Sequence, residues 1–147
     1  MKRFKFSLES VLTVRQKALE DERIRLASIM NIYNKQQDVL DEMNFKLNQL
    51  RMESEKYLEY GEFNPNLIAS YNAFAHKLIQ DIKTQEKIME KTKLELEHQQ
   101  EIAKEAYIQV KSLENLKEKQ KQQYNQELLQ EEFKMVDDIV NSRRTIA

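Results

Sequence analysis

The sequence contains a single glycine and a single proline, and these two residues lie only four positions apart, in the stretch YGEFNPN from Tyr60 to Asn66. Average usage would give a chain of 147 residues about ten glycines and about seven prolines. Both residues interrupt regular structure, so the segments on either side of this stretch can each continue as one helix. The sequence therefore predicts an all-α fold of two long helices joined by one turn.

Both ends of the predicted turn carry residues suited to it. Gly61 can adopt the left-handed conformation that ends a helix, and Asn64 can cap the next helix with Pro65 at its first position. A connection this short forces the two helices to run antiparallel. We expect residues 1–147 to form one domain, an antiparallel coiled-coil hairpin whose second helix is longer than the first. The expected bounds are about 7–60 for the first helix, 61–64 for the turn and 65–144 for the second helix.

Apolar residues recur along both helices in the heptad pattern of a coiled coil. In the first helix one row is Leu12, Leu19, Leu26, Tyr33, Leu40 and Leu47, and the other is Leu8, Arg15, Glu22, Ile29, Gln36, Met43, Leu50 and Tyr57. In the second helix the rows are Ile68, Ala75, Ile82, Met89, Leu96, Ala103 and Val110, and Tyr71, Leu78, Gln85, Thr92, Gln99, Ala106 and Leu113. Such narrow rows predict a coiled-coil seam rather than a globular core. The polar seam residues lower stability, and they either fix the register of the two helices or reach out to solvent.

The N-terminal stretch FKFSLESVL begins with alternating residues and then changes to helical spacing. This change predicts a helix start, with Ser7 as the N-cap and Phe6 stapled against Val11. Phe4 lies outside both the staple and the seam. Two interpretations remain open for it: it packs on the second helix near residues 116–124, or it contacts a partner protein.

The second helix extends beyond its partner. A turn centred at residue 63 places residue i opposite residue 126 minus i, so the residues beyond Gln123 have no partner within the chain. An apolar stripe nevertheless continues there, formed by Leu128, Leu129, Phe133, Val136, Ile139 and Val140. The stripe is either a partner-binding surface, or a segment that frays or folds back over the N-terminal phenylalanines.

Composition argues against several classes of function. The net charge of −1 provides no field for binding nucleic acid, and a two-helix fold has no concave site for catalysis or for a cofactor. The chain has no cysteine, and the lone Glu95-x-x-His98 pair falls short of a di-iron site, which needs two such pairs on four helices. Lys5, Glu9 and Arg15 break any signal-peptide core, and no window is apolar enough to span a membrane. We therefore expect a cytoplasmic, non-enzymatic protein without metal or cofactor.

Charge is unevenly distributed between the ends of the predicted hairpin. Residues 1–30 contain seven Lys or Arg against four Asp or Glu, and residues 111–121 contain four against two. Residues 35–62 contain four Lys or Arg against seven Asp or Glu. The open end is thus predicted to be basic, and the first helix near the turn acidic.

Two segments carry a family resemblance. FKFSLESVLTVRQ near the N-terminus and LENLKEKQKQQYNQELLQEEFKMVDDIV near the C-terminus, with the helical break at about residue 61 between them, resemble the FliJ family of flagellar export proteins. The resemblance implies a coiled-coil stalk similar to the gamma subunit of rotary ATP synthases. It implies three partners: the hexameric export ATPase FliI, the export gate protein FlhA and export chaperones. The implied location is the inner face of the cell membrane at the flagellar base, without insertion into the membrane.

Within this resemblance, two sets of residues are candidates for contact with partners. The set expected to face the ATPase is Phe4, Phe6, Arg15, Lys117, Lys121 and Phe133. The set expected to face the export gate is Leu50, Tyr57, Phe74, Leu78 and Gln85. Four of the gate residues are also seam positions, so coiled-coil packing is the competing interpretation for them. Phe74 lies one step off the seam and is expected to be exposed.

Other functions remain open at this point. A passive coiled-coil spacer needs neither a basic end nor an unpaired amphipathic tail, and the equivalent stalk of a virulence-type secretion system differs only in its terminal motifs. An RNA-binding helical arm is opposed by the near-neutral charge.

Overall fold

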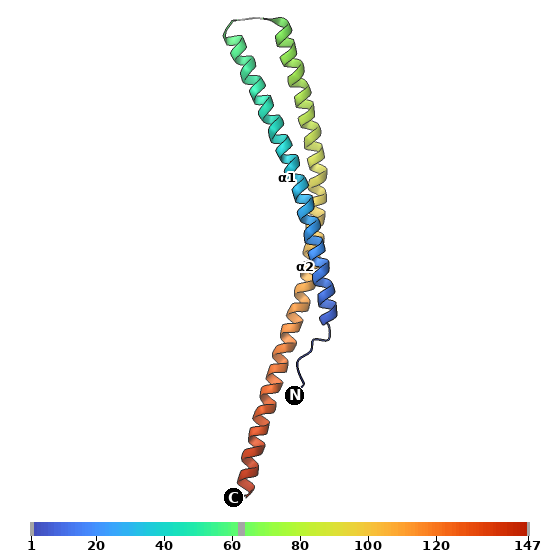
Figure 1. Ribbon diagram of the computed structural model, residues 1–147, viewed down its shortest axis with the longest axis vertical. Coiled ribbons are helices and arrows are strands. Elements are labelled where there is room, and N and C mark those ends of the chain that lie inside the picture. Colours follow the sequence, from blue (N-terminus) through green and yellow to red (C-terminus); the bar gives the residue numbers. More distant parts are fainter. Residues whose placement is uncertain (1, 62–63, 147) are drawn as a thin grey trace. The chain divides into compact units, whose positions relative to one another are not determined.

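The computed structural model describes residues 2–61 and 64–146 of the chain. Two helices make up almost all of the described part: α1, Glu9–Glu59, and α2, Pro65–Ile146 (Figure 1). No strand occurs in residues 2–61 and 64–146. At 82 residues α2 is longer than α1, which has 51. The predicted all-α class with a longer second helix is confirmed.

The two helix ends at the turn follow the predicted chemistry. Gly61 has a φ of 74°, the left-handed value, and its N–H donates to the carbonyl of Leu58 at 3.3 Å. The N-cap of α2 is Asn64, whose Oδ1 accepts from the N–H of Asn66 at 3.1 Å. Residues 62 and 63 of the predicted turn lie outside the described residues.

Contacts divide the chain into two compact units. The terminal unit consists of Met1–Glu22 and Ala103–Ala147, and the turn unit consists of Arg23–Ile102. Each unit contains an antiparallel pairing of α1 with α2 and has its own apolar cluster. The cluster of the terminal unit is built on Phe6, Leu12, Leu19 and Val110, and that of the turn unit on Leu47, Leu78 and Ile82.

The buried residues follow the predicted seam. Apart from Phe6, every residue that is buried within the described part of the chain belongs to one of the four heptad rows: Leu12, Leu19, Leu47, Leu78, Ile82, Met89, Thr92, Leu96, Gln99, Ala103 and Val110. Heptad spacing therefore determines which side of each helix is buried, because a helix brings positions three and four residues apart onto one face.

Polar seam residues are accommodated in different ways. Arg15 is exposed, and its Nη1 donates to Oε1 of Gln109 at 2.9 Å. Nε2 of Gln85 donates across the seam to the backbone carbonyl of Gln36 at 3.0 Å. The buried Thr92 donates from Oγ1 to a carbonyl of its own helix, four residues earlier. Oε1 of Gln36, by contrast, is buried with no hydrogen-bond partner among the described residues.

The start of α1 differs from the prediction. The carbonyl of Leu8 accepts the first helical bond, from Leu12 at 2.8 Å, so Ser7 lies one residue outside the cap position. Phe6 is buried in the apolar cluster, whereas Val11 is 41% exposed, so a staple on Val11 is not what buries Phe6. Burying a phenylalanine stabilises by about 1.5–3 kcal/mol and a serine cap by about 1 kcal/mol, so the burial of Phe6 contributes more at this end of α1 than a cap by Ser7 would.

Candidate interaction surfaces

The N-terminal segment of the terminal unit is held against α2 by Tyr124. The rings of Phe4 and Tyr124 have centroids 5.7 Å apart, and Oη of Tyr124 donates to the carbonyl of Lys2 at 2.5 Å. Phe4 is half-buried. Of the two interpretations for Phe4, the structure shows packing on the second helix, at the far end of the 116–124 range.

An ion pair joins the first turn of α1 to α2 in the same unit. Nζ of Lys117 lies 2.8 Å from Oε2 of Glu9, and both side chains are partly exposed. Glu9 is also the acid in the first turn of α1, where the helix dipole favours negative charge. One lysine of the basic stretch 111–121 is therefore engaged in holding the two helices together.

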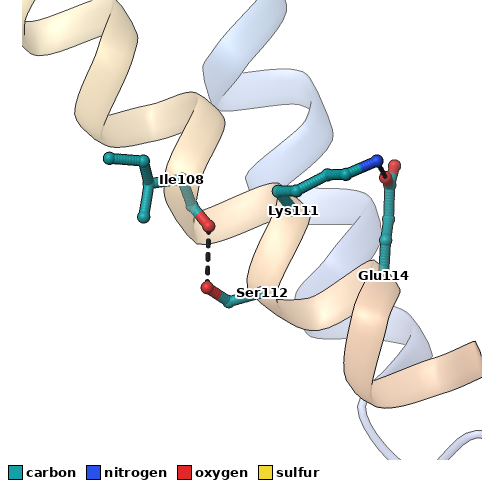
Figure 2. Close-up of polar contacts among 4 residues, drawn as sticks. All are labelled: Ile108, Lys111, Ser112 and Glu114. Atoms are coloured by element: carbon teal, nitrogen blue, oxygen red, sulfur yellow. Dashed lines mark hydrogen bonds and ion pairs between the residues drawn. The ribbon is translucent and has the colours of Figure 1, made fainter. Parts of the chain in front are cut away.

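Another lysine of this stretch interacts within α2 itself. Figure 2 shows Lys111 reaching toward Glu114, with Nζ and Oε2 4.0 Å apart, and Ser112 donating from Oγ to the carbonyl of Ile108 at 2.9 Å. Both side chains of the Lys111–Glu114 pair are about half exposed, so the pair contributes little to stability. Lys121, further along the stretch, is exposed.

The six residues expected to face the ATPase all lie in the terminal unit. They divide by accessibility. Phe6 is buried, and Phe4 and Lys117 are half-buried and engaged in contacts within the chain. Arg15, Lys121 and Phe133 are exposed, and Phe133 has 63% of its surface accessible. The accessible part of this set is thus two cations and one aromatic ring.

The C-terminal part of α2, residues 125–146, is here called the tail. It remains helical to Ile146 (Figure 1, orange to red). The predicted stripe is exposed from Leu129 onward, and Leu128 is half-buried. The tail is helical throughout its described residues and its stripe is exposed rather than packed over the N-terminal phenylalanines, so the interpretation that it folds back over them is wrong.

A shallow groove of about 270 Å³ lies in the turn unit. Residues of both helices line it: Leu50, Arg51, Ser54, Glu55, Tyr71, Asn72 and Ala75. Its lining combines apolar and aromatic side chains with an arginine and a carboxylate. A groove of this composition suits a peptide or helix of a partner better than a small ligand, because it is open and shallow.

The five residues expected to face the export gate all lie in the turn unit. Leu78 is buried, and Leu50, Tyr57 and Gln85 are half-buried at the seam, as expected for packing positions. Phe74 is 54% exposed, in agreement with its predicted position beside the seam. Phe74 and the groove at Leu50 therefore offer the accessible apolar surface of this set.

Sequence reasoning missed one structural residue, Tyr124, and one ion pair, between Glu9 and Lys117. The signal for both was available in the antiparallel pairing, because residue 126 minus i places Lys2 opposite Tyr124 and Glu9 opposite Lys117.

The described residues contain no group of three or more His, Cys, Asp or Glu side chains that could hold a metal ion. His76 lies beside Gln80 on one exposed face of α2, with Nε2 of each residue 3.3 Å apart. Neither helix, over its described length, is long and apolar enough to cross a membrane.

Comparison with known proteins gives one match. The protein-family model described as "Flagellar FliJ protein" matches residues 4–145, which covers α1, all of α2 but its last residue, and the segment before α1 from Phe4 onward. Among curated proteins and among solved structures, none matches the chain.

Proposed function

The chain belongs to the FliJ family and is a component of flagellar export, and we propose that it acts there as a non-enzymatic stalk. In this proposal the stalk couples the hexameric export ATPase FliI to the export gate protein FlhA, and it also contacts export chaperones. The proposed location is the inner face of the cell membrane at the flagellar base, reached through these partners.

The observation that carries the proposal is the extent of the family match, which reaches from residue 4 to residue 145. A match to the paired helices alone would fit any coiled coil, since heptads are common to all of them. This match also includes the N-terminal phenylalanines and the tail, which are the parts that a passive spacer does not need.

The terminal unit supports contact with the ATPase through its accessible residues. Arg15 and Lys121 present positive charge, and Phe133 adds an exposed aromatic ring. Aromatic and arginine side chains are the residues that most often dominate protein interfaces. Phe6, which is buried, contributes to this surface by fixing the segment that carries Phe4.

The turn unit supports contact with the gate through Phe74 and the groove beside Leu50. Leu78 and Gln85 pack in the seam behind this surface, and Gln85 is held by its bond to the carbonyl of Gln36. We propose that they position the contact surface and that Phe74 makes the contact itself.

The experiment that tests the stalk function is a binding assay of the full chain against the hexameric export ATPase, with the rate of ATP hydrolysis as a second readout. We expect binding and a changed hydrolysis rate. Lys121→Glu should weaken both effects, because it reverses an exposed charge without removing a packed side chain. Lys91→Glu is the matched control, since Lys91 is an exposed lysine of α2 in the turn unit.

The second candidate function is the passive spacer. Absence of binding together with an unchanged hydrolysis rate would leave this candidate in place of the stalk. If Lys121→Glu leaves binding unchanged, the stalk function stands, but the contact with the ATPase lies outside the terminal unit.

A further inference from the structure

The tail presents an apolar surface that nothing within the described chain covers. Its exposed members are Leu129, Phe133, Met135, Val136, Ile139 and Val140, with between 42% and 63% of each side chain accessible. Leu129, Phe133, Val136 and Val140 follow one another at spacings of three and four residues, and Met135 and Ile139, four residues apart, lie on one flank of this row, so the six side chains share one broad face of the helix. An exposed apolar face of this kind marks an interaction surface.

Leu129 and Val136, at the centre of this face, point away from the side of α2 that pairs with α1, whereas Met135 lies at the edge of the face nearest that side. The seam row continues from Val110 in steps of seven residues to Glu131 and Asp138, which are both charged. Leu129 and Val136 each precede one of these residues by two positions, which is about 160° around the helix at 3.6 residues per turn. The tail is therefore patterned for a partner other than α1.

Two charged residues on the apolar side of the tail indicate what kind of partner it fits. Glu132 and Arg143 are eleven residues apart, about three helical turns, so both lie on the same side of α2 as the apolar residues. Both are exposed, and neither forms an ion pair within residues 2–61 and 64–146. One end of the face thus carries an unpaired acid and the other end an unpaired base.

We propose that the tail binds the tail of a second copy of this chain, with the two helices antiparallel around a two-fold axis that passes between positions 137 and 138. In this register Glu132 of each copy lies opposite Arg143 of the other, which gives two ion pairs at the ends of the contact. Between them Val136 of one copy faces Ile139 of the other. A parallel arrangement would instead place glutamate against glutamate and arginine against arginine.

The contact is small. It extends over about five turns of each helix, which places it below about 1,200 Å² in total and in the class of weak, reversible interfaces. The proposed dimer does not depend on the stalk function, but Phe133 belongs to both the proposed dimer contact and the proposed ATPase contact. A self-paired tail covers Phe133, so the dimer and an ATPase complex that uses this side chain exclude each other.

Sedimentation velocity of the full chain over a range of concentrations tests the dimer. We expect reversible association, which Glu132→Arg and Arg143→Glu should each weaken at least about tenfold, because each places like charges opposite one another twice. The double variant should restore association, since it exchanges the two charges. Glu131→Arg is the matched control: it makes the same change one residue away, on the seam side, and should leave association intact.

Crosslinking through single cysteines tests the orientation, because the chain has no cysteine of its own. In the antiparallel dimer the two copies of position 136 are displaced by about 4.5 Å along the axis, and the two copies of position 129 by about 25 Å. A short thiol crosslinker should therefore link two copies of the Val136→Cys variant to each other, but should not link two copies of the Leu129→Cys variant.

Two results would overturn the proposal. One is a chain that stays monomeric at every concentration while its circular dichroism shows an intact helix. The other is efficient crosslinking of Leu129→Cys, which would mean parallel tails.

Discussion

Tyr124 donates a hydrogen bond from Oη to the backbone carbonyl of Lys2, a residue 122 positions earlier in the chain, and its ring packs on Phe4. The contact lies where α2 leaves the pairing with α1 and continues as the tail. It fixes the segment before α1 in place, and it separates the packed part of α2 from the exposed part.

Removing this contact should release the N-terminal segment without unfolding the helices. Tyr124→Phe keeps the ring and loses the hydrogen bond, which is partly exposed, so we expect a loss of about 0.5–1 kcal/mol. Tyr124→Ala loses the ring as well and should cost more. Limited digestion with trypsin should cut faster after Arg3 and Lys5 in both variants, and an unchanged rate of cleavage there would contradict this role of Tyr124.

Leu12 is the most buried residue of the described chain, with 3% of its surface accessible. Leu12→Ala should lower the free energy of unfolding by about 2–4 kcal/mol, because it removes buried methyl groups and leaves a cavity between the helices. Val14→Ala is the control, since Val14 is 66% exposed on the same turn of helix, and should change stability by less than about 0.5 kcal/mol. Urea unfolding followed by circular dichroism measures both variants; equal effects would mean that the two helices do not pack through this row.

Gln36 leaves its side-chain Oε1 buried and without a hydrogen-bond partner among the described residues. Gln36→Leu should raise the free energy of unfolding by about 1 kcal/mol, because an unsatisfied polar atom is replaced by apolar surface at a seam position. The backbone carbonyl of Gln36, which accepts from Gln85, is unaffected by the change. Gln49→Leu makes the same substitution at an exposed position and should have little effect. A loss of stability in Gln36→Leu would show that the amide is satisfied in solution.

Phe74 is the residue on which the proposed gate contact depends. Phe74→Ala should weaken binding to the export gate protein at least tenfold, or about 1.4 kcal/mol, as expected for an aromatic side chain at the centre of an interface. Phe45→Ala is the matched control, because Phe45 is an exposed phenylalanine of the same unit, 61% accessible, on α1. Helical content should stay constant in both variants. If both variants weaken gate binding equally, or if Phe74→Ala loses helical content, Phe74 is not the specific contact with the gate.

The fold was predictable from the sequence to the extent that local chemistry determines it. Gly61 and the Asn64-Pro65 pair sit at the only breakers in the chain, and each acts within a few residues of itself. Heptad spacing fixes which face of a helix is buried whatever the partner is, so the seam rows were predictable as well. The start of α1 was not, because it depends on Phe6 packing into an apolar cluster that includes Val110, which lies about one hundred residues away in the sequence.

The candidate surfaces were less predictable. The position of Phe74 beside the seam was enough to predict its exposure, but Phe6 and Leu78 turned out to be buried, since a family pattern does not distinguish a contact residue from the residue that supports it. The helical state of the tail was predicted to about residue 144 and the helix ends at Ile146, and the side on which the tail is apolar follows from residue spacing.

The pairing of residue i with residue 126 minus i also sets an order of events for folding. Contacts next to Gly61 close a loop of a few residues, whereas the contact between Tyr124 and Lys2 closes one of more than a hundred, and the entropic cost of closure grows with the length of the loop. Once the turn has formed, however, the two helices are already aligned, so each further heptad of the seam closes only a short loop and its entropic cost is small. Folding should therefore proceed as a zipper from the turn toward the termini, so that the phenylalanines of the N-terminal segment are the last residues to become ordered and the first to be released.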